Sequence, residues 1–308
     1  MKPEEIVKQK ILLSALNWGM GHVARCIPII HQLLQQENEI FIAGSKAQTT
    51  IFSNYFPQIN YIEHTDYPFA FGENGEFSLD LLKNSFSLYN FYRNEQKKVP
   101  EWVKNHAIDL VISDHRYGFF SKEVPSIFIT HQLHLPLSLL EKPFQILHKR
   151  FLSHFNEVWV LDTENSTFAG DLSKPLKGLN LNYIGIRSRF SLYKKNEIKQ
   201  IDQLVIVSGP LPYSVQFYHE MKQRFPSAVF IVPTYIDKEE LDKTIFHSND
   251  WKVCDQLILQ AKEIISRSGY STIMDVSFLN IHYHLVPTPG QAEQLYLSRY
   301  HKKSLLEF

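Results

Sequence analysis

The chain has 308 residues, and its 32 basic side chains balance its 32 acidic ones, so the composition does not indicate nucleic acid as a polyelectrolyte partner. The length allows two domains of about 150 residues each. Two cysteines, Cys26 and Cys254, are too few for a disulfide framework and favour a reducing compartment. The charged residues 1–10 lack a secretory signal, and no apolar run approaches the ~20 residues that span a bilayer. We therefore expect a cytoplasmic protein, soluble or peripheral to the inner face of the membrane.

In the N-terminal half, short apolar runs alternate with helical patterns. We predict strands over residues 11–16, 39–43, 59–62, 108–113, 125–129, 157–161 and 182–184. Helices are predicted after the first strand and over residues 45–55 and 77–98. Apolar residues of the last helix recur at helical spacing and are predicted to be core: Leu79, Leu82, Phe86, Tyr89 and Tyr92. The alternation predicts a parallel sheet with helices on both faces, in a first domain of residues 1–186.

A second series of the same kind follows a predicted linker, residues 186–201. Strands are predicted over residues 203–207, 228–232, 263–266 and 282–286, with helices over 213–225 and 255–262, a helix that ends near 279, and one that opens at Gln291. We therefore predict a second α/β domain, residues 187–308, and a ligand cleft between the two domains.

The turn after the first predicted strand combines glycine with basic side chains. Gly19 and Gly21 lack a Cβ, so the backbone can turn sharply and lie open to a ligand. His22 and Arg25 are three residues apart at the start of the next helix and can share a face over its N-terminus. That end of a helix attracts an oxyanion or a phosphate. A glycine turn without a ligand is also common, and spacing alone does not separate the two interpretations.

Polar residues follow three of the predicted strands, within 17–25, 114–117 and 130–134. Parallel strands place their carboxyl ends at one edge of the sheet, where ligands bind, so we expect the three clusters to meet. The candidates for ligand contacts are Asn17, Gly19, Gly21, Asp114, His115, Arg116, His131 and Gln132. His131 and His134 suggest a metal pair, but no third ligand has a recognisable spacing, so we predict no metal.

The second domain has its own candidate residues for binding an anion. Hydroxyls and glycines stand between predicted strands and helices, where free N–H groups can hold phosphate oxygens: Ser208, Gly209, Ser268, Gly269, Ser271 and Thr272. Asp275 comes one turn later and can accept from a ribose diol. Glu293 and Gln294 open the last predicted helix. Taken alone, each is equally consistent with a helix cap or a solvated polar residue.

Residues 142–155 mix large apolar side chains with cations. Such a pattern is typical of an interfacial helix that meets anionic lipid. It is also typical of a helix packed on its own sheet with a solvated basic side, which is the more common case.

Two stretches resemble a known superfamily. Ser266-Arg-Ser-Gly-Tyr-Ser-Thr-Ile-Met-Asp275, followed by Val286-Pro287 and Gln291-Ala-Glu293-Gln294, resembles the nucleotide-sugar signature of MurG-like GT-B glycosyltransferases. Gly19-Met-Gly-His22-Val-Ala-Arg25-Cys26 resembles the glycine-rich turn of the same superfamily. It is closer to the Gly-x-Gly-His-x-x-Arg-Cys turn of PseG-like UDP-sugar hydrolases. The resemblance implies a GT-B fold, in which two Rossmann-like α/β domains face each other across a cleft, the first on the acceptor side and the second binding the donor.

The resemblance also implies roles for single residues. Asp275 would hold the ribose and Gln294 the donor sugar hydroxyls, and Arg189 would meet the diphosphate. The family usually has Glu in place of Asp275 and often Gln in place of Glu293. Its usual loop is richer in glycine than Ser208-Gly209-Pro210.

We predict an inverting, metal-independent glycosyltransferase that moves a sugar from a UDP-activated donor to an acceptor hydroxyl. His22 is the predicted base because an imidazole suits that task, and Arg25 orients it or contacts the ligand. Arg189 and helix N-termini would stabilise the departing diphosphate. UDP-sugar is a co-substrate, no cofactor is expected, and the acceptor is an unknown carbohydrate or lipid-linked molecule. The alternatives are a PseG-like nucleotide-sugar hydrolase, with water as acceptor, and a catalytically silent binding protein.

Overall fold

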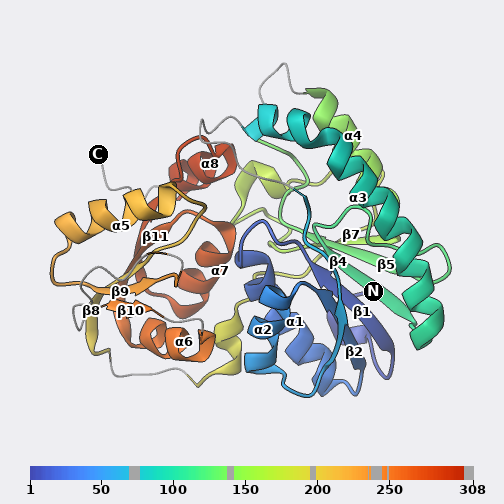
Figure 1. Cartoon of the computed structure of the whole chain (residues 1–308), viewed down its shortest axis with the longest axis horizontal. Helices are drawn as coiled ribbons and strands as arrows, with labels where there is room; N and C mark the ends of the chain where they lie inside the picture. Colours follow the sequence, from blue (N-terminus) through green and yellow to red (C-terminus); the bar gives the residue numbers. More distant parts are fainter. Residues whose placement is uncertain are drawn as a thin grey trace. The chain divides into compact units, whose positions relative to one another are not determined.

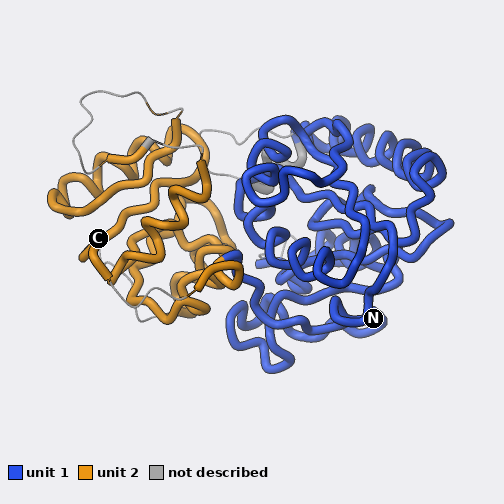
Figure 2. The backbone as a smooth tube through the Cα atoms, turned by 90° about the horizontal axis from the view of Figure 1, so that it is seen from below, with its two compact units in different colours: residues 1–70, 78–189 blue, residues 71–77, 190–308 orange. Residues whose placement is uncertain are grey.

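Parallel strands form the central layer of both compact units into which the chain divides. The computed structural model describes residues 1–68, 77–136, 142–194, 199–234, 236, 245–247 and 250–301, with the backbone alone for residues 77–82 and 247. One unit comprises residues 1–70 and 78–189, and the other comprises residues 71–77 and 190–308 (Figure 2).

The first unit is built on a parallel sheet, whose strands within the described residues have the order β3-β2-β1-β4-β5-β6-β7 (Figure 1). The strands are β1 (Lys10–Ala15), β2 (Glu39–Gly44), β3 (Asn60–Glu63), β4 (Leu110–Asp114), β5 (Ser126–Thr130), β6 (Glu157–Val160) and β7 (Leu181–Tyr183). The central strands β4 and β5 are buried at every residue, because helices cover both faces of the sheet. The carboxyl ends of β1 and β4 lie side by side, with Ala15 paired to Asp114.

The helices of this unit are α1 (Gly21–Gln35), α2 (Lys46–Tyr55), α3 (Phe77–His106) and α4 (Lys142–Leu152), with the 3-10 turns η1 (Pro3–Glu5) and η3 (Gly170–Ser173); a further 3-10 turn, η4 (Arg189–Leu192), leads into the second unit. Helices α1 and α2 contact each other and β2. Helix α3 packs through Val99 and Val103 on a cluster that includes Leu12 and Phe41. Figure 1 shows α1 and α2 on one side of this sheet and α3 and α4 on the other.

The second unit repeats the design with the strand order β10-β9-β8-β11-β12 among its described residues, again parallel. Its elements are β8 (Ile201–Ile206), α5 (Tyr213–Arg224), β9 (Val229–Val232), β10 (Ile245–His247), α6 (Trp251–Gln260), β11 (Ala261–Arg267), α7 (Tyr270–Leu279), β12 (His282–Val286) and α8 (Ala292–Tyr300). These two parallel sheets confirm the predicted α/β class with helices on both faces.

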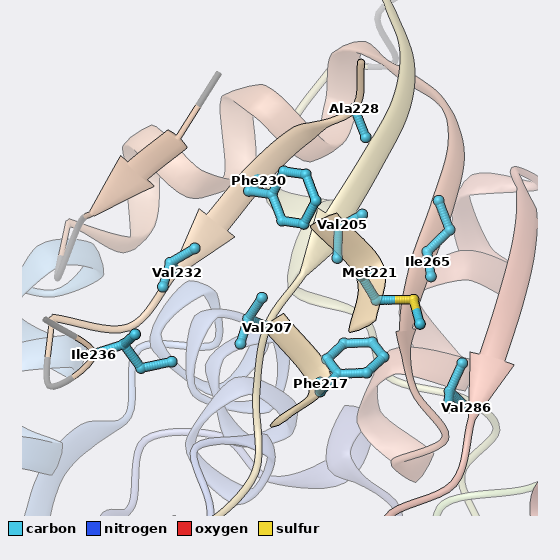
Figure 3. Close-up of a cluster of buried hydrophobic side chains, with 10 residues drawn as sticks. All are labelled: Val205, Val207, Phe217, Met221, Ala228, Phe230, Val232, Ile236, Ile265 and Val286. Carbon is cyan, nitrogen blue, oxygen red and sulfur yellow. The ribbon is translucent and has the colours of Figure 1, made fainter. Parts of the chain in front are cut away.

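Alternation along β8 separates the two cores of this unit. Val205 packs against Phe217 and Met221 of α5 (Figure 3). Its neighbour Leu204 points to the other face and packs with Ile258 of α6 and other residues of that cluster. Successive residues of a strand point to opposite faces, so one apolar run supplies both layers.

The observed elements differ from the predicted ones at three points. Residues 255–262 were expected to be helical, but α6 ends at Gln260 and β11 begins at Ala261 without a loop. The aspartate N-cap Asp250, whose side chain accepts from Lys252 N and Val253 N, starts α6 earlier than predicted. The short strand β10 was not predicted at all.

The expected linker, residues 186–201, is partly built into the second unit. Phe190 is fully buried in the cluster of Leu204 and Ile258. Tyr193 Oη donates to Asp255 Oδ2 at 2.9 Å, and Asp255 is itself fully buried. The segment therefore anchors this unit, although its polar composition predicts a solvated connector. Residues 195–198 of the predicted linker lie outside the described part.

The apolar stripe predicted to be core in the long helix α3 is only partly so. Phe86 and Tyr89 are exposed, whereas Tyr92 is half-buried against Phe151 of α4. The side chains of Leu79 and Leu82 lie outside the described part. Among the described residues, none of the helices combines the length and apolar character needed to cross a bilayer.

Candidate active site

The turn between β1 and α1 is held open by glycine. Gly19 has φ +137°, a conformation that side chains with a Cβ rarely adopt, and no atom lies within 4 Å of where its Cβ would be. Gly21 is the first residue of α1. Met20, the N-cap, supplies no side-chain hydrogen bond to the helix. His22 and Arg25 follow on the first turn of α1, as predicted from their spacing.

Asp114, the last residue of β4, is the point at which this motif converges. Arg25 Nε donates to both carboxylate oxygens, at 3.0 Å and 2.8 Å, and Arg25 Nη2 also bonds Oδ1. Cys26 Sγ lies 3.4 Å from Asp114 Oδ2. Asp114 is fully buried, which by itself would raise its pKa, yet the Arg25 guanidinium and His22 hold the pKa of this carboxyl well below its usual range. Asp114, which was predicted as a ligand contact at this strand end, is thus a fully buried, ionised anchor of the motif.

His22 is in contact with both members of this ion pair. Its Nδ1 lies 3.3 Å from Asp114 Oδ1 and 2.8 Å from Arg25 Nη2. Burial, then the charge of Arg25, lower the pKa of His22 below its ordinary value, against the opposing effect of Asp114. The imidazole is therefore neutral at pH 7. When Nδ1 carries the proton and donates to Asp114, Nε2 is an acceptor; when Nδ1 accepts from Arg25, Nε2 is a donor.

Two more histidines line this cluster. His115 has φ +58°, and its Nε2 lies 2.6 Å from Thr130 Oγ1. The ring of His115 is 5.3 Å from that of His22 and 6.0 Å from that of His131. His131 Nδ1 is 3.2 Å from Arg25 Nη1. The structure thus brings together predicted residues from all three strand ends, β1, β4 and β5, as the parallel sheet implies.

Arg116 was predicted beside these residues but belongs to a different cluster. Its side chain is fully buried, and its Nε donates to Glu95 Oε1 of α3 at 2.8 Å. Glu95 Oε1 also lies 3.1 Å from His64 Nε2, and Glu95 Oε2 accepts from Tyr67 Oη at 2.9 Å. Gly118 closes the cluster, because a Cβ there would lie 2.7 Å from Glu95 Oε2. The side chain of a polar residue after a strand can point to either face of the sheet, and that of Arg116 points into the core beneath α3.

This buried cluster of His64, Tyr67, Glu95 and Arg116 supports the turn that carries His22. Arg116 Nη1 donates to Ala15 O at the end of β1, at 3.4 Å. The backbone N–H of Tyr67 donates to Asn17 Oδ1 at 3.0 Å. Asn17 therefore fastens the turn to the fold through its Oδ1, and its predicted ligand contact stays a prediction. Gln132 is buried too, with its carbonyl accepting from His148 Nε2 at 2.9 Å.

In the second unit, the loops after β8, β11 and β12 are tied together at one sheet edge. Arg267, the last residue of β11, donates to Pro287 O at 3.0 Å and to Tyr213 O at 2.8 Å. Its guanidinium lies 4.3 Å from the centre of the Phe217 ring, and burial lowers the pKa of Arg267 to about 10. Ser268 Oγ donates to Gln294 O at 2.9 Å.

Several predicted donor residues therefore serve the loops themselves. Gln294 Oε1 accepts from the N–H of Thr288 at 2.9 Å, and its Nε2 donates to Gln291. Ser268 is fully buried. Gly209 has φ +108°, and a Cβ there would be 3.8 Å from Thr288 Oγ1.

The N-terminus of α7 is the part of this edge best suited to an anion. Gly269 is its N-cap and provides no side-chain hydrogen bond to the first turn. The half-buried residues Ser271, Thr272 and Asp275 follow on α7, and Glu293 is half-buried at the start of α8. Backbone N–H groups at such a terminus can bind phosphate oxygens.

The two arginines of the segment after β7 differ. Arg187 Nη1 donates to Gln32 at 2.9 Å and Nη2 to Glu4 at 3.1 Å, so this side chain is bound within the first unit. Arg189, the predicted diphosphate contact, is buried at the start of η4. Among the described residues, no three His, Cys, Asp or Glu side chains form a group suited to a metal ion.

Sequence reasoning missed His64, Tyr67 and Glu95, which lie far apart in the chain and carry no motif. It also missed Arg267 as a brace, although that residue stands within the quoted signature. The adjacency of Arg25, Cys26 and Asp114 follows from the neighbouring positions of β1 and β4, which the sequence does not specify.

The fold is that of GT-B glycosyltransferases, with two Rossmann-like domains, and solved structures of such enzymes match nearly the whole chain. The kitacinnamycin glycotransferase matches with a TM-score of 0.64 and 13% identity, over 97% of this chain and 86% of its own. A glycosyltransferase of Streptomyces sp. SF2575 in complex with thymidine diphosphate matches with a TM-score of 0.61 and 12% identity, over 96% and 85%. The spinosyn rhamnosyltransferase SpnG in complex with thymidine diphosphate matches with a TM-score of 0.60 and 12% identity, over 95% of this chain and 83% of its own. No family model and no curated protein sequence matches the chain.

Proposed function

We propose that the protein is a glycosyltransferase that moves a sugar from a nucleoside diphosphate sugar to an acceptor hydroxyl. The observation that carries the proposal is the partly exposed imidazole of His22 beside the ionised Asp114, at the strand edge where ligands bind in such folds. The fold it shares with glycosyltransferases, two of them bound to thymidine diphosphate, supports the same reaction class.

In this proposal His22 is the base. This role requires the tautomer in which Nδ1–H donates to Asp114 in place of the bond from Arg25 Nη2 to Nδ1, which leaves the Nε2 lone pair to accept the proton of the acceptor hydroxyl. The acceptor oxygen forms a bond to the anomeric carbon while the bond from that carbon to the diphosphate oxygen breaks, so the bonding pair leaves with the diphosphate. A single displacement of this kind inverts the anomeric configuration. Asp114 then stabilises the imidazolium that forms, and Arg25 keeps Asp114 charged.

The second unit is proposed to bind the donor. The N–H groups at the start of α7 face the diphosphate, and Asp275 accepts from the ribose hydroxyls. Arg189, the last residue of the first unit, is proposed to offset the negative charge of the departing diphosphate without a metal. The resemblance to MurG-like enzymes favours uridine as the nucleoside, whereas the matched complexes hold thymidine diphosphate, so both belong in the test.

Hydrolysis is the second candidate, because one observation favours it. The turn with His22, Arg25 and Cys26 resembles that of PseG-like UDP-sugar hydrolases, and all three side chains meet on Asp114. This gives a physical reason for the motif to occur as a unit. With water as acceptor, the same base would release a free sugar.

A panel of UDP- and TDP-sugars, incubated with and without candidate acceptors, separates these functions. Product only with an acceptor supports transfer, and free sugar without one supports hydrolysis. Binding without turnover would leave a silent nucleotide-sugar binder. Full turnover by His22→Ala would show that His22 is not the base. Unchanged affinity for UDP in Asp275→Ala would show that Asp275 does not bind the donor.

A further inference from the structure

Large exposed apolar side chains gather on the two adjacent helices α3 and α4. On α3, Phe86 is 74% exposed and Tyr89 is 58% exposed. On α4, Ile146 is 73% exposed and Leu147 is 45% exposed. Removing such side chains from water is favourable, so a group of them exposed together indicates an interaction surface.

On α3 these side chains belong to one helical face that also carries cations. Phe86, Tyr89, Arg93 and Lys97 follow each other at spacings of three and four residues, with Lys83 one turn before. All five side chains are exposed. The opposite face of α3 carries Glu95 and Val99, which are buried in the unit.

Helix α4 repeats this pattern. Ile146 has Lys142 one turn before it and Lys149 and Arg150 one turn after it, all exposed. His148 and Leu152 lie on the opposite, buried face.

The two helices are in contact, so their outer faces form one surface. Tyr92 of α3 lies 5.4 Å from Phe151 of α4, ring centre to ring centre, and 3.5 Å separates Tyr92 Oη from His154 Nδ1. Figure 1 shows α3 and α4 side by side. We call the exposed residues of these faces the α3–α4 surface: Lys83, Phe86, Tyr89, Arg93, Lys97, Lys142, Ile146, Leu147, Lys149 and Arg150.

The charge on this surface has one sign. Over residues 83–98 and 142–152, which the structure describes, Glu95 is the one acidic residue, and it is buried with Arg116; the exposed Glu101 follows one turn after Lys97, at the border of the surface. The chain as a whole is neutral, so the cations are concentrated here against the average composition. Exposed aromatic and aliphatic side chains ringed by Lys and Arg match the boundary of an anionic bilayer, where apolar groups enter the acyl region and cations meet the headgroups.

We propose that the α3–α4 surface binds the protein to the surface of an anionic lipid bilayer. Lipid binding itself is independent of the proposed reaction. Phe86 and Ile146 insert between the headgroups, and Arg93, Lys149 and Arg150 contact phosphate oxygens. Long basic side chains can place their stems along the apolar groups and their charges among the headgroups.

The inner face of α4 connects this surface to the candidate active site. His148 Nδ1 accepts from Tyr117 Oη at 2.8 Å, and its Nε2 donates to Gln132 O. Gln145 Nε2 donates to Leu133 O at 2.9 Å, and its Oε1 accepts from the N–H of Leu135 at 2.8 Å. The loop after β5, which carries His131, is therefore bonded to the helix that meets the lipid. Given the proposed function, this arrangement suits an acceptor hydroxyl carried by a membrane lipid.

Vesicle co-sedimentation of the full chain tests the proposal without turnover. The protein should bind vesicles of phosphatidylcholine with phosphatidylglycerol, bind pure phosphatidylcholine far less, and be released at raised salt. Lys149→Glu with Arg150→Glu should weaken binding about 25-fold or more, since each cation contributes about fivefold. Phe86→Ser with Ile146→Ser should weaken binding at least tenfold while keeping the salt dependence.

Matched control variants change the same chemistry elsewhere. Arg224→Glu with Lys252→Glu makes the same charge change on exposed residues of α5 and α6, and Val7→Ser with Val253→Ser removes exposed apolar groups outside the surface. Both should bind like the parent chain. The proposal is overturned if the parent chain does not bind anionic vesicles, if both surface variants bind as well as it does, or if the controls lose as much binding. If the protein binds anionic vesicles but turns over no sugar nucleotide, the proposed function is wrong and the lipid-binding proposal stands.

Discussion

The two units place different chemistry at equivalent strand ends. In the first unit, the ends of β1 and β4 hold the buried ion pair of Arg25 and Asp114 with His22 beside it. In the second unit, Arg267 at the end of β11 donates to the carbonyls of Pro287, after β12, and of Tyr213, at the start of α5, and α7 begins close by in the chain with the N-cap Gly269. In the proposed function, the first edge sets the protonation state of His22, and the second binds the diphosphate at the start of α7. The same topology would thus serve proton transfer in one unit and phosphate binding in the other.

The largest expected effect separates these two tasks. His22→Ala should lower kcat about 10²- to 10⁴-fold, because it removes the base, and should leave affinity for the nucleoside diphosphate unchanged. Asp275→Ala should do the reverse, weakening nucleotide binding with a smaller change in kcat. Steady-state kinetics together with calorimetric titration of UDP and TDP check both. If both variants lost kcat and nucleotide affinity to the same extent, the proposed division of tasks between the two units would be wrong.

Next in size is the buried ion pair. Arg25→Ala leaves the carboxylate of Asp114 buried without its cation and should destabilise the protein by about 3–5 kcal/mol. Arg187→Ala is the matched control, because its partner Glu4 is exposed and such pairs contribute about 0–1 kcal/mol. Urea denaturation measures both free energies of unfolding. A loss for Arg25→Ala no greater than that of the control would mean that Asp114 is not held charged by Arg25.

Acid should weaken the first unit through its buried histidines. Burial lowers the pKa of His148 to about 4, below its ordinary value of 6.5. The unfolded chain then binds more protons, so stability is full above pH 6.5 and falls as the pH drops toward 4, by up to about 3 kcal/mol. The lowered pKa of His22 acts in the same direction. Unfolding free energies measured from pH 7 to pH 4 should show the slope, and His148→Gln should reduce it; an unchanged slope would contradict this assignment.

The smallest effect concerns the brace of the second unit. Arg267→Met keeps the packing on Phe217 but removes donors to two carbonyls, and should cost about 1–3 kcal/mol. Because it frees the loops that flank α7, nucleotide affinity should fall severalfold while the pKa of His22 stays unchanged. Titration of the His22 ring by NMR, beside nucleotide binding, tests whether the units act separately.

Most strands were predictable because parallel strands buried on both faces form continuous apolar runs, as residues 11–16 and 108–113 do. The roles of single polar residues were harder. Asp114 and Arg116 are two residues apart, yet one anchors the site and the other joins Glu95 on the opposite side. The neighbouring sequence does not distinguish their roles, because Arg25 lies 89 residues from Asp114 and Glu95 lies 21 residues from Arg116. Phe86 and Tyr89 have core-like spacing but face outward, because periodicity reveals a stripe without revealing what covers it.

Gly118 lies where the loop after β4 packs against helix α3, between the buried cluster of Glu95 and the exposed face of that helix. Its missing side chain lets the backbone of α3 approach, since a Cβ would come within 2.9 Å of Tyr92 O as well as 2.7 Å of Glu95 Oε2. The close packing of α3 against the loop after β4 therefore requires glycine at residue 118. Phe86 and Arg93 lie on that helix, so a methyl group added at residue 118 should displace both the proposed lipid-binding residues of α3 and the Glu95–Arg116 pair that supports the turn with His22.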